Sequence, residues 1–237
     1  MDINMNMHMK MNMHMNHPNT NANVSKSIFS SSPTSTLSPL FANRKLHSTG
    51  KLTLEEFTEL IPTVIRTSNT KNQTKDDPIE NLFHRLQVTP EEMSAYTFIT
   101  EDKKYTRNLI STDDETYTLL LLCWNPNKAS PIHDHPCDGC WMKILQGGIN
   151  EKRYRLDENQ QELICTKDST FREGEIAFID DHLGLHKVGN EGNELAISMH
   201  LYSPPFGKCR IWMDERDGGN SSIAHMCNHS EFGSLVE

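Results

Sequence analysis

Two histidines one residue apart, His133 and His135, are followed five residues later by Cys140. On a β-strand, side chains two positions apart point to the same face, so these two imidazoles can approach one metal ion together. Neutral imidazole nitrogen binds zinc, iron, copper and nickel, and thiolate sulfur is a further ligand type. The spacing therefore indicates a metal site, with Cys140 as a candidate for a fourth ligand or a nucleophile.

A site of this kind needs a third ligand, and two later histidines are candidates. His186 lies beyond an apolar run at 176–179 and has apolar neighbours in Leu185 and Val188. His182 lies four residues earlier, and spacing alone does not exclude it. Three nitrogen ligands without a carboxylate suit several transition metals, so the ligand types do not select one of them.

Composition and charge describe a globular protein of one or two domains. The chain has 237 residues, of which 35% are hydrophobic and 23% charged, and its formal net charge is −9. An acidic protein without a basic patch argues against nucleic acid as a partner. No apolar stretch resembles a secretory signal or a membrane span, so we predict no membrane partner, six free thiols in a reducing compartment and a cytoplasmic location.

Residues 1–51 are rich in Met, Asn, Ser and Thr and are predicted to be a disordered tail. Such a composition offers few branched apolar side chains to bury. Methionine and histidine together also suit copper, and a Ser-rich, acid-poor segment is compatible with a mitochondrial presequence, although this one holds a single arginine. Residues 52–237 are predicted to form the folded domain.

Three helix starts follow one another at the beginning of that domain. Thr53 and Glu56 have the spacing of a capping box and precede apolar residues at helical intervals. Asp77 precedes Pro78, and proline is well tolerated in the first turn of a helix. Residues 89–92 repeat this arrangement. The sequence therefore predicts a small N-terminal helical cap.

The remaining sequence is typical of short β-strands separated by Gly, Asn, Asp and Pro. The predicted strands lie at 116–124, 141–145, 176–179, 195–202 and 210–213. Gly147-Gly148 and residues 189–193 are expected to form hairpin turns. Several short strands without intervening helices predict a mainly β fold, a small β-barrel or jelly roll whose mouth can hold a ligand.

The order of these residues resembles the two motifs of the cupin superfamily. The matching positions are His133-x-His135, Cys140, Gly147, Gly174 and His186-x-x-x-Asn190. Cys140 stands where most cupins have a glutamate ligand, and this substitution, with the segments 105–109 and 198–206, closely resembles the eukaryotic-type cysteine dioxygenase type I family. The resemblance runs from about Leu52 to Phe232. It departs at Asn127, where the family has glycine, at Asp180, where it has proline, and in the tail.

The resemblance implies an enzyme that oxidises a small thiol. One Fe(II) ion per subunit would be held by His133, His135 and His186. L-cysteine would bind it through sulfur and amine, with O2 in the remaining position, and would leave as cysteine sulfinic acid. Arg107 offers the planar fork that pairs with a carboxylate in bidentate fashion, and Tyr105, two residues away, is expected to support that contact.

Ser198, His200 and Tyr202 alternate along an apolar strand, which places them on one face, directed either into the barrel or to solvent. The resemblance implies a relay that presents the Tyr202 hydroxyl to the substrate, and a thioether between Cys140 and Tyr202 as a protein-derived cofactor. Cys137 is a competitor for that linkage.

The resemblance also implies further properties of the domain. Cys209 is expected beside the cavity, the Ser203-Pro204 bond is expected to be cis, and the protein is expected to be a monomer. Its role would be cysteine catabolism towards taurine or sulfate. Two alternatives stay open: a dioxygenase for another small thiol, such as cysteamine or 3-mercaptopropionate, and a cupin that binds metal without turnover.

Overall fold

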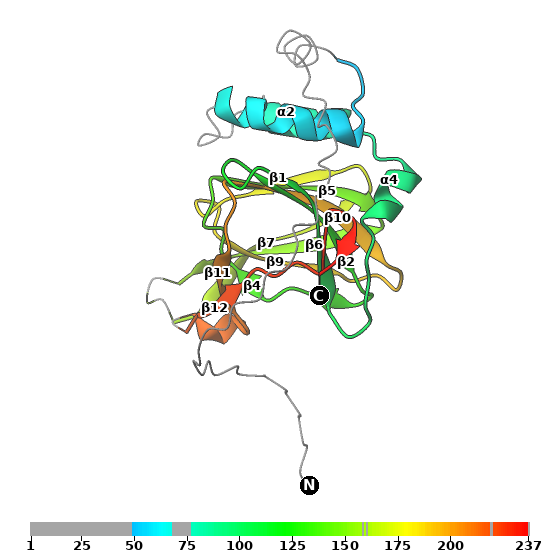
Figure 1. Ribbon diagram of the computed structural model, residues 1–237. Helices are drawn as coiled ribbons and strands as arrows, with labels where there is room; N and C mark the ends of the chain where they lie inside the picture. Colours follow the sequence, from blue (N-terminus) through cyan, green and yellow to red (C-terminus); the bar gives the residue numbers. More distant parts are fainter. Residues whose placement is uncertain (1–48, 68–76, 158, 160, 219, 237) are drawn as a thin grey trace, which may run out of the picture. The chain divides into compact units, whose positions relative to one another are not determined.

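A computed structural model describes residues 49–67, 77–157, 159, 161–218 and 220–236. The predicted tail lies outside these residues except for 49–51. Three helices come first: α2 (Leu54–Thr67), α3 (Pro78–Arg85) and α4 (Pro90–Ala95). In Figure 1, α2 lies across the outer face of the sheet that contains β1, β5 and β10. The predicted helical cap is therefore confirmed.

The helices begin where their capping residues predict. Thr53 Oγ1 accepts from the Glu56 backbone N–H, and the Glu56 carboxylate accepts from the Thr53 N–H. Asp77 Oδ1 accepts from two backbone N–H groups in the first turn of α3, and its Oδ2 accepts from Trp141 Nε1 at 2.7 Å. At the other end of α3, Lys143 Nζ donates to two carbonyls. Two strand residues therefore hold both ends of this helix against the sheet.

Asp77→Ala is expected to lower the free energy of unfolding by about 2 to 4 kcal/mol. The change removes a helix cap, worth roughly 1 kcal/mol, and leaves the buried Trp141 Nε1–H without a partner, which costs about 1 to 3 kcal/mol. Urea unfolding measures the loss. Thr89→Ala is the matched control, because it removes the cap of the exposed helix α4 without orphaning a buried donor. Equal losses in the two variants would contradict the role given to the Trp141 contact.

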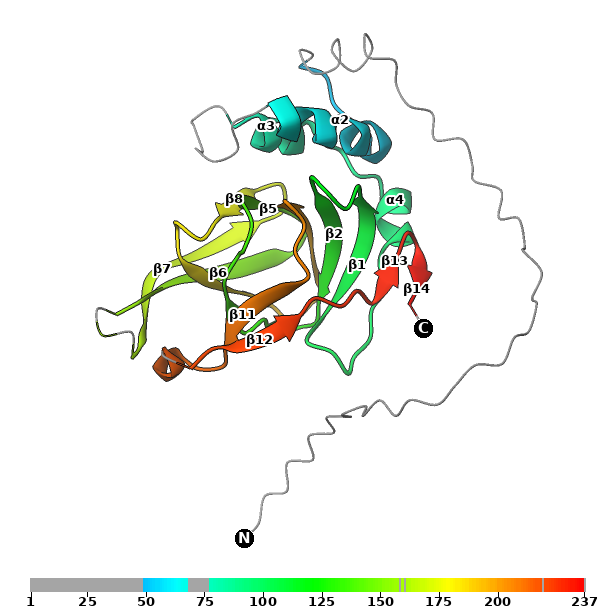
Figure 2. The same cartoon turned by 60° about the vertical axis from the view of Figure 1, so that its left-hand side comes forward.

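The strands form two sheets that face each other (Figure 2). One sheet has the order β14-β13-β1-β2-β10-β5-β8, and the other has the order β12-β11-β4-β9-β6-β7, with β3 beside β9. The strands of the first sheet are β1 (Tyr105–Thr112), β2 (Thr118–Trp124), β5 (Gly139–Gln146), β8 (Ile176–Ile179), β10 (Ala196–Ser203), β13 (Ser230–Glu231) and β14 (Ser234–Leu235). Those of the second are β3 (Lys128–Ala129), β4 (Ile132–His133), β6 (Gly148–Leu156), β7 (Leu163–Arg172), β9 (Leu185–Asn190), β11 (Lys208–Trp212) and β12 (Ser222–His225). A short 3-10 helix, Glu215–Asp217, follows β11. The predicted mainly β barrel is confirmed.

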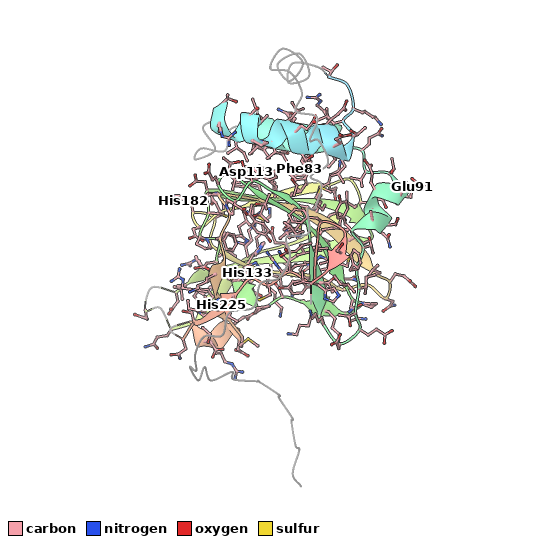
Figure 3. The ribbon with its side chains drawn as sticks, viewed as in Figure 1. Phe83, Glu91, Asp113, His133, His182 and His225 are labelled. Carbon is pink, nitrogen blue, oxygen red and sulfur yellow. The ribbon has the colours of Figure 1, made fainter. Side chains whose placement is uncertain are left out.

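Strand β10 lies between β2 and β5 in the first sheet and is buried along its whole length. Ile197, Met199 and Leu201 belong to the core cluster that the helices α2 and α3 complete, which includes Phe83 (Figure 3). The opposite face of β10, with Tyr202, packs into the cluster between the two sheets. The alternative that Ser198, His200 and Tyr202 point to solvent is therefore wrong, because the facing sheet buries their side of β10.

The predicted strands are confirmed, with shifts of at most two residues at their ends. The sequence did not reveal β6 and β7, which are the longest strands of the second sheet. Most side chains of β7 are exposed, so it has no alternation of polar and apolar residues to mark it. Pairing with β6 along its length, and not its own composition, makes this segment a strand.

Both predicted hairpin turns are wrong. The turn at Gly147 joins β5 to β6, and residues 191–195 join β9 to β10, but in each case the two strands belong to different sheets. A short glycine-containing turn has the same local sequence whether the chain folds back on its neighbour or crosses to the facing sheet. Gly147 has a φ of 74°, which glycine adopts at little cost. Asn127, which replaces a family glycine, has a φ of 54°, and asparagine tolerates this region better than most residues.

Candidate metal centre and substrate cavity

Three histidines from two strands converge between the sheets. His133 lies on β4 opposite His186 on β9, and His135 follows β4 by two residues. One ring nitrogen from each lies within 4.8 Å of the others, and His133 Nε2 and His186 Nε2 are 3.1 Å apart. Figure 3 shows His133 among the side chains between the sheets. The three predicted ligands are therefore brought together.

Hydrogen bonds on the far side of two rings decide which nitrogen is free. His133 Nδ1 lies 3.1 Å from the Pro131 carbonyl, and His186 Nδ1 lies 2.8 Å from Glu151 Oε1. Both partners only accept, so each Nδ1 carries the proton and each Nε2 is a bare lone pair. Two lone pairs then face each other at 3.1 Å, which a cation between them would satisfy.

His135 strengthens the case for a cation. Its side chain is fully buried, and neither ring nitrogen has a hydrogen-bond partner among the described residues. A buried polar atom without a partner costs free energy, and metal coordination removes that cost for one nitrogen. Burial also holds the pKa of all three histidines below the usual value, so they are neutral and able to bind a metal. The residues present fit a transition-metal ion such as iron(II).

His182, the other candidate for third ligand, is not part of this group. Its side chain is 92% exposed, and its Nδ1 lies 3.7 Å from the Asp180 carboxylate. In Figure 3 it lies at the margin of the molecule, away from His133. The structure therefore groups His186 with His133 and His135, as the resemblance implies, and leaves out His182, which spacing alone does not exclude.

The segment that carries His133 and His135 is fixed by two carboxylates. Asp134, between the two histidines, accepts from the Arg210 backbone N–H at 2.7 Å and from Arg210 Nε at 2.6 Å. Asp181 Oδ1 accepts from the His135 backbone N–H at 2.8 Å. The backbone here makes only a two-residue strand, so these contacts hold the two imidazoles in place where strand pairing ends.

A chain of hydrogen bonds runs along the inner face of β10. Trp124 Nε1 donates to Ser198 Oγ at 2.8 Å, and Ser198 Oγ lies 2.8 Å from His200 Nε2. His200 Nδ1 lies 3.5 Å from the Tyr202 hydroxyl. The indole only donates, so Ser198 Oγ accepts from Trp124 and is free to donate its own proton to His200 Nε2. That arrangement would leave the proton of His200 on Nδ1, towards Tyr202. Burial and the Arg107 charge lower the pKa of His200 to about 3, which keeps the ring neutral.

Cys140 and Tyr202 lie directly opposite each other on the neighbouring strands β5 and β10. Opposed residues on antiparallel strands have their Cβ atoms about 5 Å apart, so the thiol and the phenol ring are neighbours. Cys140 Sγ also lies 4.0 Å from His200 Nδ1. Cys137 lies in the preceding bend, where its thiol donates to the Gly139 carbonyl. The strand register therefore favours Cys140 over Cys137 as the neighbour of Tyr202.

Among the residues that the structure describes, one charged side chain suited to an anion lines the cavity beside the histidines. Arg107 lines it, its Nε is buried without a partner among the described residues, and its guanidinium lies 5.7 Å from the centre of the Tyr202 ring. None of the described residues that line the cavity carries a carboxylate. Tyr105 and Cys209 also line it, and Tyr105 stacks on Trp124 with ring centres 4.5 Å apart. The cavity therefore suits a small molecule with an anionic group.

Two residues of this region had no signal in the sequence. Glu151 lies among polar neighbours on β6, and nothing local distinguishes it from an exposed residue. Trp124 ends a run of apolar residues, which is typical of a core position. Their contacts with His186 and Ser198 come from other strands and become visible only in the folded chain. The expected cis bond at Ser203-Pro204 is confirmed.

The sequence is similar to one protein family over most of its described length. A family profile with the description "Cysteine dioxygenase type I" matches residues 49–216. Cysteine dioxygenase type 1 of Rattus norvegicus is 35% identical over 159 residues, which cover 66% of this chain and 78% of that protein. The Homo sapiens protein is 34% identical with the same coverage, and the Danio rerio protein is 34% identical over 150 residues, 62% of this chain and 74% of that protein. A solved structure with a double-stranded β-helix domain from Klebsiella pneumoniae has a TM-score of 0.39 at 14% identity, covering 56% of this chain and 87% of that one.

Proposed function

Because this chain belongs to the cysteine dioxygenase type I family, we propose that it oxidises L-cysteine with O2 to cysteine sulfinic acid (3-sulfinoalanine). The observation that carries the proposal is the convergence of His133, His135 and His186. Iron(II), when bound by these residues, supplies the redox chemistry that adds both oxygen atoms to the substrate sulfur. The reaction needs no reductant, because one thiol and one O2 give one sulfinic acid, R–SH + O2 → R–SO2H.

Arg107 is proposed to capture the substrate carboxylate. It contributes the one guanidinium among the described residues that line the cavity, and its buried Nε lacks a partner there. A guanidinium and a carboxylate pair through two parallel hydrogen bonds, which fixes the orientation of the ligand as well as its charge. Tyr105, which also lines the cavity, is proposed to support the bound carboxylate.

The chain from Trp124 to Tyr202 is proposed to direct a proton into the cavity. The proton on His200 Nδ1 faces the Tyr202 hydroxyl oxygen, which then acts as acceptor. The phenolic proton of Tyr202 is thereby left free to point to the substrate. Burial raises the pKa of Tyr202, so the phenol keeps this proton at neutral pH. Ser198 and His200 thus act through Tyr202.

A thioether between Cys140 and Tyr202 is proposed as a protein-derived cofactor. The cross-strand pairing of the two residues supports it. Joining sulfur to a ring carbon removes one hydrogen from the thiol and one from the ring, and O2 accepts the two electrons. The covalent bond restricts the rotamers of Tyr202, so holding its hydroxyl in place costs less conformational entropy.

The linkage is expected to appear as a peptide pair two hydrogens lighter than its parts after turnover with iron, cysteine and O2. Cys140→Ser is expected to abolish it, because a hydroxyl does not replace the thiol in this chemistry. Cys137→Ser is the matched control and should retain the linkage in full. Peptide mass spectrometry after trypsin digestion decides between them. A linkage that survives in Cys140→Ser and disappears in Cys137→Ser would overturn the assignment.

For the protein's setting we propose a monomer in the cytoplasm, without nucleic-acid or membrane partners, and a role in cysteine catabolism towards taurine. In the part of the chain that the structure describes, no helix is long and apolar enough to cross a bilayer.

The activity is tested by O2 uptake of the iron-loaded protein, with the product identified by mass spectrometry. We expect cysteine-dependent uptake of one O2 per sulfinate formed. Faster uptake with cysteamine or 3-mercaptopropionate would assign the enzyme to another small thiol. No uptake with any of the three would leave a cupin that binds metal without turnover.

A further inference from the structure

The three histidines of the metal centre do not have equivalent surroundings. His186 Nδ1 is bonded to a carboxylate oxygen of Glu151, His133 Nδ1 is bonded to a backbone carbonyl, and His135 has no partner among the described residues. A carboxylate withdraws the Nδ1 proton more strongly than a neutral carbonyl, which makes Nε2 of the same ring a better donor. His186 is therefore expected to be the strongest of the three ligands.

The Glu151 carboxylate is buried and fixed between two partners, His186 and Arg153. Its side chain is 1% exposed, and one oxygen lies 2.8 Å from His186 Nδ1 while the other accepts from Arg153 Nε at 2.8 Å. Arg153 Nη2 in turn donates to the Phe178 carbonyl at 2.6 Å. The guanidinium fixes the carboxylate's orientation and compensates its burial, because a buried carboxylate is stable only when paired.

We propose that Glu151 is a positioning residue for the metal, which sets the tautomer and the donor strength of His186. The inference rests on the proposed function insofar as the metal is iron(II). Three neutral imidazoles bring no negative charge to a buried dication, and Glu151 is the carboxylate that contacts one of them directly. Its hydrogen bond keeps the proton on Nδ1 and leaves Nε2 for the metal. The register of β6 with β9 places the two residues on neighbouring strands.

The test is an anaerobic titration of Glu151→Gln with Fe(II), without cysteine. We expect affinity to fall roughly 10- to 100-fold, as is typical when such a partner of a ligating histidine is lost. The reduction potential of the bound iron should move to more positive values, because a weaker donor stabilises the ferric state less. Glu173→Gln is the matched control, since it removes the same charge from an exposed position and should leave both quantities unchanged.

Two further measurements separate positioning from a general effect on folding. Glu151→Asp keeps the charge but withdraws the oxygens by one methylene, so it should give a smaller loss of affinity and a smaller shift of potential. The gain in Tm on adding Fe(II) should shrink in both variants, because ligand binding stabilises the folded state in proportion to its affinity. The inference would be overturned if, in both variants, the Fe(II) affinity stayed within twofold of the wild type and the reduction potential stayed within experimental error of it. If the wild-type protein binds iron but oxidises no thiol, the proposed function is wrong, while the effect of Glu151 on iron binding can still be measured.

Discussion

His133→Ala is expected to lose iron almost completely and, with it, all cysteine-dependent O2 uptake. A structural zinc ion bound by four protein ligands gains about 10 to 16 kcal/mol, or about 3 kcal/mol for each ligand. By this scale, loss of one of only three ligands should weaken iron binding roughly 100-fold or more. His133 Nε2 lies 3.1 Å from His186 Nε2, and no other described side chain is grouped with them to replace it. Iron content after gel filtration and an Fe(II) titration measure the effect.

His182→Ala is the matched control for this experiment. It removes an imidazole four residues from His186, but one whose side chain is exposed and paired with Asp180. Iron content and O2 uptake should equal those of the wild type. If His182→Ala loses iron while His133→Ala keeps it, the three-histidine centre is wrong. Both variants are expected to fold, since neither His133 nor His182 belongs to the apolar core clusters.

Arg107→Gln is expected to lower kcat/KM for L-cysteine by about 100-fold or more. Two hydrogen bonds to a charged group are lost, each worth about 1.5 to 3 kcal/mol, and about 1.4 kcal/mol corresponds to a factor of ten. KM should carry most of the loss, because the contact binds the carboxylate both before and during the reaction. Steady-state kinetics with cysteine measures it, while iron content should stay at the wild-type level, because Arg107 is not a ligand.

Two comparisons make the Arg107 result specific. Arg107→Lys keeps the charge but not the planar fork, so it should recover only part of the activity. Cysteamine, which lacks a carboxylate, should be used equally well or poorly by wild type and Arg107→Gln. A parallel fall for both thiols would show that Arg107 supports the architecture of the cavity and not the recognition of the substrate's anionic group.

The sequence determined what depends on neighbours along the chain. The helix starts at Thr53, Asp77 and Thr89 were predicted because a capping side chain bonds to backbone groups within three residues. The polar face of β10 was predicted because strand side chains alternate strictly. His133 and His135 were predicted to form a metal-binding pair for the same reason. Family resemblance then supplied the activity, which spacing alone left open among several metals and roles.

The tertiary structure decided what depends on residues far apart in the chain. Spacing along the chain leaves His182 and Cys137 open as candidates. The pairing of β4 with β9 and of β5 with β10 places His186 beside His133 and Cys140 against Tyr202, as the resemblance implies. The turn at Gly147 crosses between sheets although its sequence is that of a hairpin. Glu151 looks like a solvated residue until the neighbouring strand brings His186 to it. Strand register is set by the burial of a whole face, so a contact across strands has no signal in either strand alone.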